Sequence, residues 1–170
     1  MHQRRTAKDG YDWFGRKFKG VEAGSVFAVP LSDGTYAFGR LMNAKDGATI
    51  AEFFRARRDT PDFDDGIINS GRLFGPTGVL ITAIDAPNRK RPWKVVHKDA
   101  DFYPDDLYDI RFARGTGPGN WAYFTLENQF ETLGPLSDDD VGSWRVGFNL
   151  PQQPETLTQA IERRLEAEGL

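Results

Sequence analysis

The chain has 170 residues, of which 39% are hydrophobic and 28% are charged, and its formal net charge is −3. A chain of this length can bury a core as one domain, and the absence of Cys excludes disulfides, thiolate metal sites and cysteine nucleophiles. The 13 Phe, 5 Tyr and 4 Trp favour β structure. No stretch is apolar enough for a secretory signal or a membrane span, so we expect a cytoplasmic protein without a membrane partner.

The first 20 residues are basic and rich in aromatic residues. They contain six Lys or Arg and two Asp, which gives this segment a charge of +4 and leaves −7 for the rest of the chain. The spacing of their aromatic residues fits either a short helix or an extended segment. We expect residues 1–23 to form an arm that docks its aromatic rings on the domain. The alternative is an arm that contacts nucleic acid or a membrane.

The clearest local pattern is a β-hairpin near the start of the acidic body. Two apolar runs, residues 26–31 and 36–42, flank a short turn in which Gly34 can adopt the positive φ that a tight hairpin requires. Both faces of the first run are apolar, which predicts a strand buried on both sides. Pro30 cannot donate to a strand ladder, so we expect a bulge or an unpaired edge beside it.

Further strands are predicted along the body, at residues 48–55, 79–84, 93–98, 121–126 and 144–150. The segment 56–78 is expected to be irregular apart from one helical turn around Ile67 and Ile68. An acidic turn at residues 138–140 is expected to separate the last two strands.

The hydrophobic period changes at the C-terminal end. Leu157, Ile161 and Leu165 recur every four residues, which predicts one amphipathic helix within residues 151–170 that lies across a sheet. Pro154 fits its first turn, Gly169 its end, and a capping box is predicted for Thr156 and Gln159. The polar face is expected to place these side chains in water: Glu162, Arg163 and Glu166.

These elements predict a β-dominant α+β fold. We expect a single domain over residues 1–170, with a β-rich body at residues 24–150 and the helix after it. The sheet is expected to be twisted and mostly antiparallel, or to form a small open barrel.

Catalytic and cofactor motifs are missing from the sequence. It contains no HExxH, no GxSxG and no Gly-Lys-Ser/Thr, so we expect neither an enzyme nor a cofactor. The glycine-rich segment 114–119 contains Pro118, which removes a donor that a phosphate-binding loop would need, so a connecting loop is favoured. The aspartates of residues 62–65 lack the distal Glu of a calcium loop, so no metal site is predicted.

His97 is the one candidate general base outside the first residues of the chain. We place it on the same strand face as Trp93 and Val95, which favours a packed, hydrogen-bonded side chain. A hydrolase that pairs His97 with a nearby carboxylate is the alternative.

An acidic and aromatic run after residue 98 is the best candidate for a binding site. Its carboxylates can attract a basic partner over a distance, and its rings can anchor that partner at contact. The alternative is a solvated loop whose rings turn inward. The predicted partner-binding residues are Asp99, Asp101, Phe102, Tyr103, Asp105, Asp106 and Tyr108.

Two segments carry a family resemblance. Residues 24–40 contain a Gly, an apolar strand that ends in Val-Pro-Leu, an Asp-Gly turn and the sequence Tyr-Ala-Phe-Gly-Arg. Residues 92–96 read Pro-Trp-Lys-Val-Val, and the acidic aromatic run follows them. With these features the chain resembles the immunity protein 26 family of bacterial polymorphic toxin systems. It departs from the family at His97, where members often have Gly, and the resemblance does not extend to residues 113–170.

The resemblance implies a β-rich protein without enzymatic activity that binds and neutralises a cognate toxin by stoichiometric contact. The acidic body favours a basic toxin, and a nuclease is one class that fits, because carboxylates can occupy a site shaped for phosphates. Nucleic acid is a less favoured partner. The alternative function is a small β-barrel module that binds nucleic acid through its basic N-terminal arm.

Overall fold

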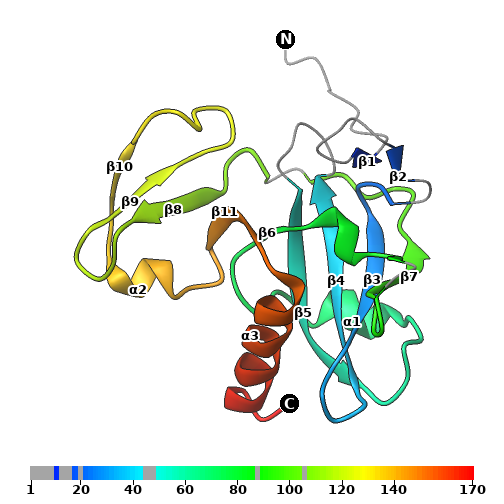
Figure 1. Ribbon diagram of the computed structural model, residues 1–170. Helices are drawn as coiled ribbons and strands as arrows, with labels where there is room; N and C mark the ends of the chain where they lie inside the picture. Colours follow the sequence, from blue (N-terminus) through cyan, green and yellow to red (C-terminus); the bar gives the residue numbers. More distant parts are fainter. Residues whose placement is uncertain (1–9, 12–16, 19–20, 44–48, 87–88, 105–106) are drawn as a thin grey trace.

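The computed structural model describes residues 10–11, 17–18, 21–43, 49–86, 89–104 and 107–170 (Figure 1). Nine strands form one open sheet in the order β10-β9-β8-β11-β6-β5-β4-β3-β7. Their bounds are β3 (Ser25–Pro30), β4 (Tyr36–Asn43), β5 (Ile50–Arg58), β6 (Thr77–Val79), β7 (Lys94–Lys98), β8 (Arg111–Gly115), β9 (Trp121–Phe124), β10 (Gly134–Leu136) and β11 (Val146–Gln152). The helices are α1 (Asp65–Asn69), α2 (Asp138–Val141), α3 (Pro154–Ala167) and a 3-10 turn, η1 (Ile81–Ala83).

The sheet is mostly antiparallel, and the predicted α+β class is confirmed. Among the strands that the structure describes, β11 alone makes parallel pairs, with β6 on one side and β8 on the other. Strands β7 and β10 are the two ends of the strand order, so the sheet stays open and does not close into a barrel. A separate pair, β1 (Gly10–Tyr11) and β2 (Lys17–Phe18), lies within the predicted arm; Trp13 and Phe14 lie outside the described residues.

The predicted hairpin is confirmed as strands β3 and β4. Their register runs from Val26 opposite Arg40 to Pro30 opposite Tyr36, and Gly34 in the turn has a φ of 90°. Strand β7 pairs with β3 only as far as Ala28. Pro30 therefore extends beyond the part of β3 that β7 covers, as its missing donor requires.

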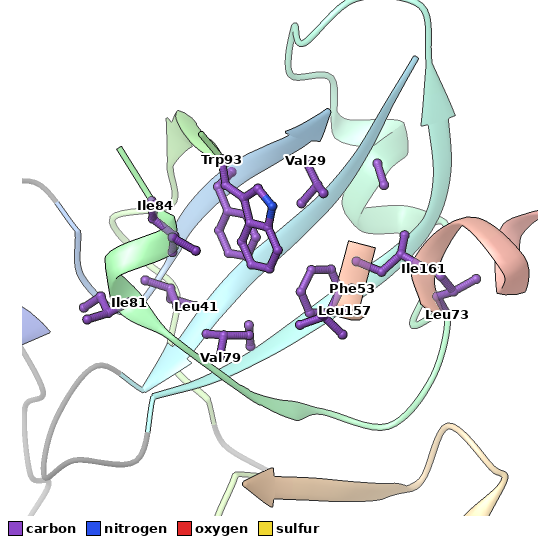
Figure 2. Close-up of a cluster of buried hydrophobic side chains, with 14 of the residues drawn as sticks. Val29, Leu41, Phe53, Leu73, Val79, Ile81, Ile84, Trp93, Leu157 and Ile161 are labelled. Carbon is purple, nitrogen blue, oxygen red and sulfur yellow. The ribbon is translucent and has the colours of Figure 1, made fainter. Parts of the chain in front are cut away.

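Strands β3, β4 and β5 are buried on both faces, as the apolar pattern of β3 predicts. On one face Phe27, Val29 and Phe53 pack with Trp93 and with the apolar side of α3 (Figure 2). On the other face Phe38 and Phe54 pack around Ile67 of α1. Alternation along each strand produces the two faces, because successive side chains point to opposite sides of a sheet.

Gly39 explains part of the Tyr-Ala-Phe-Gly-Arg pattern. A Cβ at this position would lie 2.6 Å from Cζ of Phe27, so a larger residue would displace that ring. The absence of a side chain at Gly39 leaves room for Phe27 to stack on Trp93, with ring centroids 5.4 Å apart and planes at 2°. The glycine and the tryptophan of the two matching segments therefore serve one packing contact in the core.

The C-terminal helix is confirmed, with two corrections. Leu157, Ile161 and Leu165 are buried against the sheet, and α3 runs beside β5 in Figure 1. The predicted capping box at Thr156 and Gln159 is wrong: α3 begins earlier, with Gln153 as the N-cap residue and Pro154 in its first turn. Arg163 and Glu166 are exposed as predicted, whereas Glu162 is half-buried and its carboxylate accepts a hydrogen bond from the backbone N–H of Ser32 in the hairpin turn.

Three other local predictions need correction. The strand predicted at residues 79–84 is wrong, because β6 ends at Val79 and the chain turns through η1, which buries Ile81 and Ala83 in the core. The acidic turn at residues 138–140 is the short helix α2, whose N-cap Ser137 and Asp140 exchange hydrogen bonds in a capping box. Strand β10, which pairs with β9, was not predicted.

Candidate partner interface

The acidic aromatic run forms the loop between β7 and β8, which we call the acidic loop (residues 99–110). It contains five Asp and no Lys or Arg. Its first residue is fixed to the start of β3, since the backbone N–H of Asp99 donates to the carbonyl of Gly24 at 3.1 Å. Gly24 has a φ of 89°, and a Cβ there would lie 2.4 Å from the carbonyl oxygen of Asp99. Glycine at position 24 thus lets the acidic loop approach the sheet.

A buried ion network fixes the same end of the loop to the sheet. Glu52 of β5 is 3% exposed, and its two carboxylate oxygens accept hydrogen bonds from Arg40 at 2.6 and 2.8 Å and from Arg72 at 2.7 Å. Arg40 also contacts the carboxylate of Asp99, with Nη1 and Oδ2 3.4 Å apart. Two guanidinium groups and two carboxylates therefore balance their charges where the loop leaves the sheet.

The side chain of Phe102 points inward and is half-buried. The guanidinium of Arg40 lies 4.1 Å from the centre of its ring, and the ring packs on a cluster that includes Leu107 and Ile110 of the same loop. These apolar residues hold the loop against the body of the protein. For Phe102 the structure therefore matches the alternative in which aromatic rings of the loop turn inward.

Most of the remaining described residues of the loop are exposed. Tyr103 is 49% exposed, Tyr108 is 43% exposed, and Asp101 and Asp109 are exposed as well. Asp105 and Asp106 lie outside the described residues. The geometry thus brings acidic and aromatic side chains to the surface of a loop whose base is fixed by Gly24, the ion network and Phe102.

His97 lies on the face opposite to the one predicted. The register pairs Val26 with His97 but Phe27 with Val95, so Val96 is an extra residue that shifts the alternation of β7. The imidazole stacks on Phe63, with ring centroids 3.9 Å apart and planes at 4°, away from the cluster of Trp93. A bulge of this kind leaves no trace in the residue pattern, which is why the prediction failed.

Asp64, one of the aspartates of residues 62–65, has a structural partner. Asp64 accepts hydrogen bonds from Arg58, the nearer at 3.0 Å, and these bonds are the main cause that lowers the pKa of Asp64. Among the residues that the structure describes, no group of three or more His, Asp or Glu could hold a metal ion. No helix in the described part of the chain is long and apolar enough to cross a membrane.

Two features of this region were not predicted. The first is the ion pair of Arg40, a charged residue among the apolar residues of β4. A charge in such a strand indicates a buried ion pair, but the sequence does not identify Glu52 as the partner. The second is Phe130, which is 91% exposed in the loop after β9. Its signal is a single aromatic residue within the polar run of residues 127–132.

The family comparison covers the part of the chain that contains these features. The model of the family described as immunity protein 26 matches residues 22–121, which contain the hairpin, the Trp93 strand, the ion network and the whole acidic loop. The chain belongs to the immunity protein 26 family, as the resemblance of residues 24–40 and 92–96 predicted. No curated protein and no solved structure matches the chain.

Proposed function

We propose that this chain binds and neutralises a cognate toxin in the cytoplasm by stoichiometric protein contact, without catalysis. Membership of the immunity protein 26 family supports an immunity role. The contact itself, its surface and the chemistry of the toxin are the proposed part.

The observation that carries the proposal is the outward face of the acidic loop. Asp101, Tyr103, Tyr108 and Asp109 reach the surface from a loop whose base is fixed to the sheet. A fixed loop loses little conformational entropy when it binds, and exposed tyrosines supply large contact areas with few rotatable bonds. These properties suit a binding surface.

The charge of the loop indicates a basic toxin surface. The segment 99–110 carries five negative charges, of which Asp99 is partly balanced by Arg40. Such a surface attracts a positively charged partner over several ångströms and raises the rate of association. A nuclease fits this description, because the groove that binds phosphates is positively charged and carboxylates can occupy it.

The proposal is tested by co-expression of the chain with the toxin encoded by the neighbouring gene. We expect the chain to restore growth and to co-purify with that toxin, whereas an unrelated toxin of the same activity is neither bound nor neutralised. Loss of growth despite normal levels of the folded chain would refute the proposed function.

A further inference from the structure

Phe130 is the most exposed large apolar side chain among the described residues, at 91%. It lies in the loop that joins β9 to β10, which we call the Phe130 loop (residues 125–133). Leu133 of the same loop is also exposed. A ring that is 91% exposed contributes little to the stability of the fold, and aromatic residues are enriched where proteins contact their partners.

The Phe130 loop is held in place by hydrogen bonds. Arg114 of β8 donates to the carbonyl of Gln129 at 2.5 Å, and its guanidinium lies 4.5 Å from the ring centre of Phe124. Within the loop, Asn128 donates to the carbonyl of Thr125 at 3.1 Å and Glu131 donates to the carbonyl of Asn128 at 3.0 Å. Phe130 is therefore presented by an ordered turn.

The Phe130 loop begins beside the acidic loop. Phe124 pairs with Phe112, which places the end of β9 next to the start of β8, where the acidic loop ends. Leu126 and Phe102 pack on the same buried cluster, so the two loops rest on the same group of buried side chains. In Figure 1 the loop between β9 and β10 lies at the top of the molecule, near the end of the sheet that the acidic loop crosses.

Charge indicates what covers Phe130. Glu127 and Glu131 lie on either side of Phe130 in its own loop, which contains no Lys or Arg, and the guanidinium of Arg114 is engaged by the carbonyl of Gln129 and the ring of Phe124. The charged residues of the Phe130 loop therefore have the same sign as the acidic loop. A partner that covers this ring has to carry basic groups around an apolar pocket.

We propose that Phe130 is a second anchor for the basic toxin, inserted into an apolar pocket beside the surface that the acidic loop contacts. This inference rests on the proposed function. The ring lies beyond residue 121, where the family match ends. Phe130 is therefore placed to distinguish the cognate toxin of this chain from the toxins of other family members.

The test uses the full chain and a catalytically inactive form of the toxin encoded by the neighbouring gene. Phe130→Ala removes a side chain with almost no contacts, so folding is retained. We expect binding to weaken by about tenfold or more, mainly through faster dissociation. Trp144→Ala is the matched control, because Trp144 is another exposed aromatic residue. It follows α2, beyond the opposite end of β10. This variant should change affinity by less than about twofold.

Each other outcome overturns the inference. If the unchanged chain binds the toxin and Phe130→Ala binds equally well, the anchor is wrong while the proposed function stands. Equal losses in both variants would also contradict a specific anchor. If the unchanged chain dimerises in sedimentation and Phe130→Ala is monomeric, a second copy of the chain covers the ring. If the unchanged chain does not bind the toxin, the proposed function itself fails.

Discussion

Glu52 lies near the start of β5, where its side chain is only 4% exposed and has two arginine partners. Burial of a charge is costly unless it is paired, and loss of one member leaves the others uncompensated. The residue therefore links the sheet to the acidic loop through Arg40, and its removal should affect both stability and the loop.

We expect Glu52→Gln to lower the free energy of unfolding by about 3–5 kcal/mol, because a neutral amide cannot balance two buried guanidinium groups. Urea unfolding measures this change. Glu22→Gln is the control, since Glu22 forms an exposed pair with Lys98 at 3.4 Å and should contribute less than about 1 kcal/mol. Similar losses in the two variants would contradict the role assigned to the buried network.

Asp33 in the hairpin turn gives a prediction for pH. Hydrogen bonds from Thr35, the nearest at 2.7 Å, and the guanidinium of Arg57 lower the pKa of Asp33 from 3.8 to about 2. A carboxylate with a lowered pKa stabilises the folded state above pH 3.8, and this contribution is lost as the pH falls toward 2.

Asp33→Asn should therefore reduce stability at neutral pH and make it less dependent on pH in the acid range. Thermal unfolding between neutral and acid pH measures both effects. Asp59→Asn, an exposed carboxylate after β5, serves as the control. If Asp33→Asn and the unchanged chain lose stability in parallel as the pH falls, the turn contributes no pH dependence.

At the scale of elements, the chain separates into segments that can be predicted locally and contacts that cannot. The β3–β4 hairpin and α3 depend on short-range patterns: a turn with Gly34, alternating apolar residues, and a four-residue repeat. The position of β11 between β6 and β8 depends on pairings across the sheet, which no local pattern encodes. The bulge at Val96 belongs to the same group. The capping box of α2 does not, because Ser137 and Asp140 are three residues apart and form a local pattern that the prediction missed.

The candidate interface was predicted only in part, because some of its contacts also depend on which strands lie side by side. The composition of residues 99–109 identifies the segment as acidic and aromatic. It does not reveal that Phe102 faces inward or that Arg40 fixes Asp99, since both depend on the neighbouring strand β4. The Phe130 loop becomes its neighbour only through the pairing of β8 and β9.

If the acidic loop steers the toxin, reversal of its exposed charges should slow association. We expect the double variant Asp101→Lys/Asp109→Lys to reduce the association rate by about tenfold or more at low ionic strength, and by less at high salt, because salt screens long-range attraction. Surface plasmon resonance with the inactive toxin measures both rates.

The matched control for this variant is Asp59→Lys/Asp62→Lys. These exposed aspartates follow β5 at the end of the sheet where Arg58 pairs with Tyr36, and the acidic loop lies at the other end. The control has the same net charge as the test variant but should associate faster. Equal rates for the two variants would mean that net charge matters and the position of the loop does not.

At the scale of the whole molecule, one sheet supports both loops. Residues 22–121 match the family and supply the hairpin, the Trp93 packing and the acidic loop. Later residues complete the same sheet through β11 and cover one face with α3. The two loops therefore share a single framework, which lets contacts at both act on one partner.

We propose that this framework neutralises a toxin by one-to-one contact. The most direct measurement is a titration of the purified toxin's activity with the chain. We expect activity to fall in proportion to the chain added, to end at about one chain per toxin, and to be unchanged by longer incubation, as tight stoichiometric binding requires. Undiminished activity at excess chain, or inhibition by trace amounts that grows with time as an enzyme's would, would contradict the account.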